Sequence, residues 1–341
     1  MNRERILYMS VLVLGGAGYI GSHAVDQLIA RGYNVIVVDN LGTGHRAAVH
    51  NEATFYEGDI RDKAFLDDVF NNESIEGVFH FCAYSLVGES VEKPLAYFNN
   101  NMHGLQVLLE VMYDHQVGHI IFSSTAAVYG EPDSVPITEE DSKAPTSPYG
   151  ESKLMMEKMM HWSHEAYGVN YAALRYFNVA GAKENGAIGE DHRPETHLIP
   201  IVLEVALGQR EHLTIFGDNY DTEDGSCIRD YLHVVDLIDA HILAYQHLQN
   251  GGASGAFNLG SSQGYSVFEI LEAARTVTNE PIEAVVGERR AGDPSKLIAS
   301  SDKAQQVLGW KPQHDNINDI INSAWQWHHQ HPNGYQENVE G

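Results

Sequence analysis

A glycine-rich turn near the start of the chain constrains the fold more than any other feature. Gly15, Gly18 and Gly21 follow directly on the branched apolar run 11–14. Glycines at this spacing permit a tight turn, close approach of the backbone to a diphosphate, and close packing of a helix on a strand. The sequence therefore predicts a buried parallel strand, the turn, and a helix over 22–31 whose first N–H groups point toward phosphates.

An acidic residue ends the second expected strand. The run 34–38 is apolar after its first residue and leads into Asp39. A carboxylate at this place can accept hydrogen bonds from the hydroxyls of an adenosine ribose, and it repels a 2′-phosphate. We therefore expect NAD rather than NADP. Strand, glycine turn, helix, strand and acid in this order form a strong nucleotide-binding signature.

Tyr149 and Lys153 lie four residues apart in an expected helix over 148–167 and so share one face of it. An ammonium beside a phenol favours the phenolate and lowers the tyrosine pKa from its usual value of about 10. That makes Tyr149 a candidate general base near neutral pH. Alone, such a pair usually marks a solvated helix face, but the nucleotide-binding signature upstream favours the catalytic interpretation.

Strand-like runs alternate with helical patterns over the first half of the chain, which predicts an α/β fold with a Rossmann-like, doubly wound parallel sheet. We assign residues 1–180 to this NAD-binding domain and residues 181–341 to a smaller C-terminal substrate-binding α/β domain. The boundary is left open for segments near 229–262, which could return to the first domain. The further strands are expected at 77–81, 118–122 and 171–175, and the helices at 94–115, 148–167, 198–207, 234–248 and 268–276.

The charge balance argues against several classes of partner. The chain carries 21 Lys and Arg against 47 Asp and Glu, a formal net charge of −26, whereas proteins that bind nucleic acid or anionic membranes use basic patches. No stretch approaches the roughly 20 apolar residues of a membrane span. Two cysteines, Cys82 and Cys227, give no disulfide framework and suggest a cytoplasmic protein. The 19 histidines show no recognised zinc or iron spacing, so we predict no metal.

Further motifs extend the signature along the chain from Val11 to about Pro312. The motifs are Gly15–Ser22, Val87–Ser90, Ser123–Thr125, Tyr149–Lys153, Arg175–Asn178, Ile228–Tyr231 and Arg290–Asp293. In these motifs the chain resembles the extended short-chain dehydrogenase/reductases, and among them the UDP-glucose 4-epimerases. The resemblance implies NAD-dependent, reversible epimerisation at C4 of UDP-glucose and UDP-galactose through a 4-keto intermediate, a UDP-hexose substrate, and a homodimer formed through the helices 94–115 and 148–167.

The resemblance also implies roles for individual residues. Tyr149 takes the proton of the sugar 4-hydroxyl, Thr125 hydrogen-bonds the reacting oxygen, and Lys153 holds the nicotinamide ribose. The implied cofactor residues are Gly15, Gly18, Tyr19, Ile20, Gly21, Asp39, Asn40, Asp59, Ile60, Phe81, Ala83, Asn101, Ser123, Tyr149, Lys153 and Phe177. The implied substrate residues are Thr125, Tyr149, Asn178, His197, Leu198, Phe216, Arg229, Arg290, Asp293 and Leu297.

Two of these positions depart from the family pattern. His197 stands where an asparagine often contacts the nucleotide side of the substrate. Leu297 stands where some members carry a tyrosine beside the sugar C2 substituent. Because leucine is smaller than tyrosine, we expect side activity on UDP-N-acetylglucosamine and UDP-N-acetylgalactosamine.

Three other functions fit parts of the sequence. A C4 epimerase of UDP-uronic acids or UDP-pentoses differs only in the shape of the pocket. A nucleotide-sugar 4,6-dehydratase needs an acid beside Thr125, where this chain has Ala126 and Ala127. A non-catalytic NAD-binding regulator has no need of Tyr149 and Lys153.

Overall fold

A seven-stranded parallel sheet forms the centre of the protein, in a computed structural model that describes residues 10–290 and 293–336. The strand order β11-β6-β5-β4-β1-β2-β3 is that of a doubly wound sheet, which confirms the predicted fold class. Every neighbouring pair in it is parallel. The strands are β1 (Ser10–Leu14), β2 (Asn34–Asp39), β3 (Thr54–Glu57), β4 (Ile75–His80), β5 (His119–Thr125), β6 (Asn170–Tyr176) and β11 (Gly255–Leu259).

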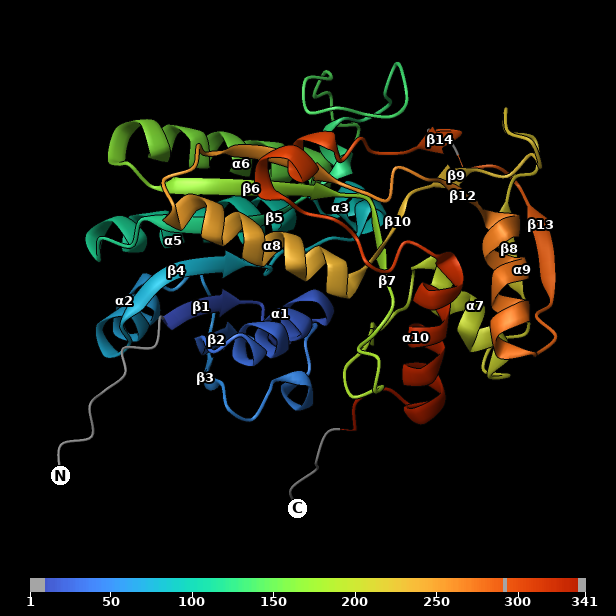
Figure 1. Cartoon of the computed structure of the whole chain (residues 1–341), viewed down its shortest axis with the longest axis horizontal. Helices are drawn as coiled ribbons and strands as arrows, with labels where there is room; N and C mark the ends of the chain where they lie inside the picture. Colours follow the sequence, from blue (N-terminus) through green and yellow to red (C-terminus); the bar gives the residue numbers. More distant parts are fainter. Residues whose placement is uncertain (1–9, 291–292, 337–341) are drawn as a thin grey trace.

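Both faces of the sheet are buried, which explains why its inner strands read as continuous apolar runs. In β1, Val11 and Val13 belong to one core cluster and Leu12 and Leu14 to another, because successive side chains of a strand point to opposite faces. Helices α1 (Tyr19–Ala30) and α8 (Val234–Gln249) cover the first face, and α2 (Lys63–Asn72), α5 (Gly104–Asp114) and α6 (Pro148–Tyr167) cover the second (Figure 1).

Several predicted boundaries differ from the structure. The first helix begins at Tyr19 rather than residue 22, because Gly18 is already its N-cap. The edge strand β3 was missed, since its sequence TFYE is partly exposed and lacks an apolar run. The expected helix 94–115 is α4 (Pro94–Tyr97), the π-helical segment η2 (Phe98–His103) and α5, whereas the expected helix 148–167 is α6.

A smaller lobe lies beside the sheet, on the side where β6 leads into β7 (Figure 1). It has its own core, built around Ile199, Leu203, Ile270 and Ile320. α8 and β11 lie with the large sheet although they follow residue 180, so the two lobes interleave along the chain; the division at residue 180 stays a prediction. The lobe and its border contain β7 (Asn178–Ala180), α7 (Leu198–Ala206), β8 (Leu213–Phe216), β9 (Ile228–Arg229), β10 (Tyr231–His233), β12 (Tyr265–Ser266), α9 (Val267–Thr278), β13 (Ala284–Gly287), β14 (Lys296–Leu297) and α10 (Ile317–Gln330).

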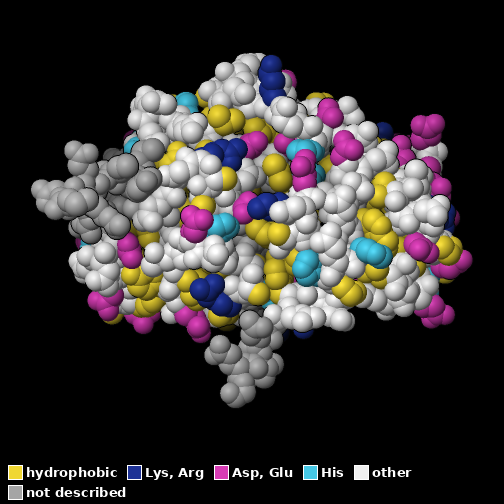
Figure 2. Space-filling view, turned by 60° about the horizontal axis from the view of Figure 1, so that its bottom comes forward, with side chains coloured by type: hydrophobic (Ala, Val, Ile, Leu, Met, Phe, Trp, Pro, Cys, Tyr) yellow, Lys and Arg dark blue, Asp and Glu magenta, His cyan; other side chains and the backbone are white. Residues whose placement is uncertain are grey.

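Short elements complete the chain: η1 (Arg46–Ala48), α3 (Val87–Glu92), η3 (Ala126–Val128) and η4 (Ala304–Leu308). No described helix combines the length and the hydropathy needed to cross a membrane. Figure 2 shows acidic side chains spread over one face of the molecule rather than gathered into a single patch. The strong negative charge is therefore distributed over this face.

The contact between the glycine turn and α1 generates a prediction about stability. A Cβ atom added to Gly21 would lie 2.0 Å from the carbonyl oxygen of Gly15, and neither backbone segment can yield cheaply. We expect Gly21→Ala to lower the free energy of unfolding by about 1–3 kcal/mol, as overpacking usually does. Urea denaturation measures this loss. Gly118→Ala is the matched control, because a Cβ atom there meets nothing within 4 Å; equal stability of the two variants would contradict the prediction.

Candidate active site

The glycine turn forms a cradle at the start of α1. Gly15 has a φ of +79°, and a Cβ atom on it would lie 2.7 Å from the backbone nitrogen of Cys82, just after β4. The N-cap Gly18 has no side chain to occupy the first N–H groups of α1. These N–H groups therefore remain available for an anionic ligand, and the missing side chains leave room for its close approach.

A cavity of about 150 Å³ adjoins this cradle and collects many of the predicted cofactor residues. Asp39 lies at its wall with Oδ2 accepting the Ala17 N–H at 2.9 Å and Oδ1 accepting the Leu41 N–H at 2.8 Å. Burial raises the pKa of Asp39. The carboxylate is thus oriented by the turn itself, at the place predicted to meet a ribose. Predicted residues that line the cavity are Gly15, Gly18, Asp39, Asn40, Asp59, Ile60, Phe81 and Ala83.

An ion pair that the sequence did not predict fixes Asp59, another residue of the cavity wall. The Arg61 guanidinium donates to Asp59 at 2.6 Å and holds the pKa of that carboxyl well below its usual range, at about 2. The amide of Asn40 lies 3.5 Å from the same carboxylate. The Asp59 carboxylate therefore stays ionised at neutral pH, with its charge balanced by Arg61.

Asn101 does not line this cavity. It is fully buried in η2, where its amide accepts the Tyr84 N–H at 2.9 Å and donates to the Tyr84 carbonyl at 3.1 Å. It also donates to the Ser152 hydroxyl at 3.0 Å. Asn101 thus fixes the loop after β4 relative to α6, while its neighbour Asn100, which was not predicted, lines the cavity. A π-helical segment at such a place is typical of functional sites.

Three predicted catalytic residues converge beside the carboxyl end of β5. Ser147 caps α6 by accepting the Gly150 N–H, so Tyr149 lies in the first turn of that helix. Thr125 ends β5, and its hydroxyl interacts with Tyr149 so as to lower the tyrosine pKa. The Lys153 ammonium donates to the Ser123 carbonyl at 2.8 Å.

The predicted lowering of the Tyr149 pKa is wrong in this structure. Burial raises the pKa of Tyr149 by more than the Thr125 hydrogen bond lowers it. Lys153 lies on the same helical face, but its ammonium is committed to a backbone carbonyl, and burial lowers its own pKa to about 8. The spacing in the sequence predicts the face of the helix on which Lys153 lies. It does not predict which group the end of this long side chain contacts.

Most of the predicted substrate residues lie in or beside the smaller lobe. Arg229 forms an ion pair with Asp293, so its charge is largely neutralised. The exposed Arg290 stacks on Phe216 with its guanidinium carbon 3.9 Å from the ring centre. Leu297 pairs in register with Arg229. Asn178 begins β7 and Leu198 begins α7. Phe177 and Leu297 both pack against the core cluster that includes Leu154 of α6. Ala291 and Gly292 lie outside the described residues.

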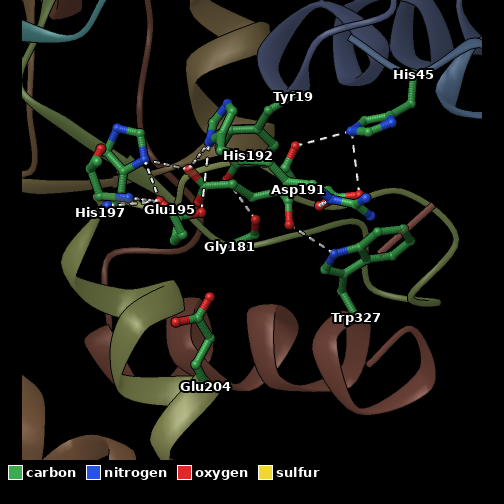
Figure 3. Close-up of polar contacts among 12 residues, drawn as sticks. Tyr19, His45, Gly181, Asp191, His192, Glu195, His197, Glu204 and Trp327 are labelled. Carbon is green, nitrogen blue, oxygen red and sulfur yellow. Dashed lines mark hydrogen bonds and ion pairs between the residues drawn. The ribbon is translucent and has the colours of Figure 1, made fainter. Parts of the chain in front are cut away.

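His197, the N-cap of α7, lies in a cluster with Glu190, His192 and Glu195 (Figure 3). Burial by itself lowers the pKa of His192, but Glu190 and Glu195 raise it to about 9. The same two carboxylates outweigh burial at His197 and raise its pKa to about 10. His192 and His197 also line a second cavity of about 640 Å³ that shares Ala83 with the first one. The signal in the sequence was five histidine and acidic residues within the eight residues 190–197.

Comparison with known proteins assigns the chain to a family. The assignment agrees with the glycine cradle, with Asp39 at the end of β2, and with Tyr149 and Lys153 on α6. The NAD dependent epimerase/dehydratase family matches residues 11–260. The chain belongs to this family. Within it, the chain is 60% identical over 327 residues to a UDP-glucose 4-epimerase of Lacticaseibacillus casei, which covers 96% of this chain and 99% of the relative.

Solved structures of epimerases superimpose closely on this family member. A crystal structure of a UDP-glucose 4-epimerase, 59% identical, matches with a TM-score of 0.95 over 96% of this chain and 100% of the other. The UDP-glucose 4-epimerase from Bifidobacterium longum in complex with NAD+ and UDP, 40% identical, matches with a TM-score of 0.90 over 96% of this chain and 100% of the other.

The buried ammonium of Lys153 generates a prediction about pH. Its pKa of about 8 lies below that of an unfolded lysine, about 10.4, so between these values the unfolded chain binds more protons. This residue therefore makes the free energy of unfolding rise with pH over that window, by an amount on the order of 3 kcal/mol. We expect Lys153→Met to remove this rise in the protein stripped of ligands, as measured by urea unfolding from pH 7.5 to 10.5. Lys158→Met, at an exposed position of the same helix, should keep it; a rise that survives in Lys153→Met would refute the assignment.

Proposed function

We propose that the chain interconverts UDP-glucose and UDP-galactose by inverting the configuration at C4, with NAD held in the cradle of α1. The observation that carries the proposal is that Thr125, Tyr149 and Lys153 meet at the carboxyl end of β5, beside a glycine turn where added Cβ atoms would clash. The high identity to UDP-glucose 4-epimerases over nearly the whole chain supports the same reaction.

Each catalytic side chain has a task that its position suits. When bound, NAD supplies the acceptor and donor of a hydride. The Tyr149 phenolate takes the proton of the sugar 4-hydroxyl and, as the phenol, later returns it to the same oxygen, while Thr125 holds the phenol oxygen in place. Lys153, whose ammonium is held by the Ser123 carbonyl, would hold the nicotinamide ribose. The 4-keto sugar turns over within the site and is reduced on its other face, so only the configuration at C4 changes.

Asp39 in the wall of the first cavity supports NAD rather than NADP. Its carboxylate is held by two backbone N–H groups. This carboxylate opposes a 2′-phosphate by charge repulsion, whereas it can accept hydrogen bonds from ribose hydroxyls. Cys82 and Cys227 are both unpaired, and we assign the enzyme to the cytoplasm on that basis.

The substrate end of the site is assigned to the smaller lobe. Arg290 stands exposed over Phe216, where a flat uracil and a diphosphate find an aromatic face and a positive charge. A 4,6-dehydratase is disfavoured, because η3 begins with two alanines where that reaction needs an acid beside Thr125. Activity on UDP-N-acetylhexosamines, based on Leu297, stays a prediction.

The decisive experiment removes one oxygen atom. Tyr149→Phe keeps the ring but loses the group that moves the proton, so we expect turnover of UDP-galactose to fall by about 10²–10⁴-fold with little change in UDP-sugar binding. The assay follows formation of UDP-glucose without added NAD. Tyr167→Phe, at an exposed position near the end of the same helix, is the control and should turn over normally. Near-normal turnover of Tyr149→Phe would overturn the mechanism.

A homodimer is the assembly that we propose. Leu95 is 78% exposed and Trp162 68% exposed, which is unusual for large apolar side chains, and Val91, Tyr113 and Tyr167 are exposed as well. All of them lie on α3, α4, α5 and α6, which pack against one another on one face of the sheet. A twofold contact between two copies of this face would bury the apolar side chains of both.

The dimer is tested by placing a charge on this face. We expect Leu95→Asp to shift the protein from dimer toward monomer in sedimentation equilibrium, because the new carboxylate would be buried without a partner. Val286→Asp is the control, since Val286 is also exposed but lies on β13 in the smaller lobe. A parent protein that sediments as a monomer would exclude the proposed dimer.

A further inference from the structure

Four side chains from one short segment converge outside the proposed catalytic residues. Glu190, His192, Glu195 and His197 lie between β7 and α7, and their ligand atoms are all within 4.8 Å of one another. The Nδ1 atoms of the two histidines face the carboxylates. Nδ1 of His197 lies 2.8 Å from Glu190 and 3.0 Å from Glu195, and Nδ1 of His192 lies 3.1 Å and 3.7 Å from the same groups.

The two carboxylates are buried without a permanent cation. The side chain of Glu190 is 5% exposed and that of Glu195 is 6% exposed. Within the described part of the chain, no lysine or arginine forms an ion pair with either of them, although Arg193 lies in the same segment and reaches Asp191 instead. Buried carboxylates need a compensating charge close by, which protonated His192 and His197 can supply. A divalent cation at the centre of the cluster would supply two positive charges in their place, and the two histidines would release their protons as it binds.

We propose that Glu190, His192, Glu195 and His197 form a binding site for one divalent transition-metal ion, with Zn²⁺ as the best match. Two imidazole nitrogens and two carboxylate oxygens are zinc ligands, and zinc favours four of them in a tetrahedron. Bonds of about 2.0–2.2 Å place tetrahedral ligand atoms about 3.4 Å apart. The nitrogen–oxygen contacts in the cluster, 2.8 to 3.7 Å, bracket that value. Mg²⁺ and Ca²⁺ fit less well, because they prefer oxygen ligands alone.

The structure also offers an entry path. A cavity of about 350 Å³ is lined by Glu190, His192 and Glu195 and extends toward Glu204 of α7 and His328 of α10. Figure 3 shows Glu204 beneath the cluster, pointing from α7 toward it. An incoming cation would meet the Glu204 carboxylate on its way, which favours its capture.

A cation bound at this site would hold in place the segment that joins the two lobes. The backbone of Glu190 accepts the Trp327 indole N–H at 3.1 Å, and His45, from the loop after β2, contacts Asp191 at 3.3 Å. His197 caps α7. A cation held by this segment would fix the start of α7 relative to α10 and the loop after β2. The inference departs from the prediction of no metal, and it does not depend on the proposed epimerase activity.

The test uses untagged full-length protein, because a polyhistidine tag would itself bind zinc. The protein is stripped with a chelator, dialysed, and titrated with ZnCl₂ by isothermal calorimetry. We expect one Zn²⁺ per chain, a higher Tm in its presence, and no comparable binding of MgCl₂. His192→Asn and Glu195→Gln should each weaken Zn²⁺ binding at least tenfold. His329→Asn is the matched control, since it removes an exposed histidine from neighbouring α10 and should leave the affinity unchanged.

Three outcomes would overturn the proposal. The first is parent protein that binds no stoichiometric Zn²⁺, which would leave the cluster as histidine–carboxylate pairs alone. The second is binding that persists in His192→Asn and Glu195→Gln but falls in His329→Asn, which would place the ion on surface histidines. The third is equal binding of Mg²⁺ and Zn²⁺, which would indicate general attraction to the acidic surface. Circular dichroism of each variant shows whether lost binding reflects a lost fold.

Discussion

The close contact between Gly15 and Gly21 is the constraint on which the rest of the site depends. It brings α1 against the turn after β1, and it brings the turn against the end of β4. The same turn supplies the Ala17 N–H that orients Asp39. Because no side chain fills this space, the first turn of α1 faces a cavity instead of a packed core. The cradle, the position of Asp39 and the cavity therefore all result from the close approach of the backbone at Gly15 and Gly21.

Sequence alone predicts the parts of this protein that depend on local pattern. The continuous apolar runs of β1 and β2 reflect a sheet buried on both faces, and the capped helix α6 was predicted with its correct bounds. The short edge strand β3 could not be predicted, because a half-exposed edge strand carries no apolar run. The π-helical turn in η2 escaped because it depends on the buried amide of Asn101, which bonds a distant loop.

The candidate site divides in the same way. Glycines, Asp39, Thr125 and Tyr149 could be predicted because backbone geometry or strand ends fix them. The contact made by the end of a long side chain could not be predicted. Lys153 reaches the Ser123 carbonyl, and Arg229 pairs with Asp293, which is 64 positions away. The cluster of Glu190, His192, Glu195 and His197 was not predicted, for another reason. Its spacing matches no recognised metal motif, and only the folded segment brings the four groups together.

The interleaving of the two lobes has a consequence for how the protein is made. Edge strand β11 pairs with β6 in the large sheet, yet it is separated from β6 by most of the first part of the smaller lobe. On the ribosome, β6 must therefore wait with one edge unpaired until about residue 259 has emerged. Exposed strand edges are a source of misassembly in nascent chains. The period in which the nascent chain is prone to misassembly at the β6 edge thus falls late in synthesis, after the nucleotide cradle has been translated.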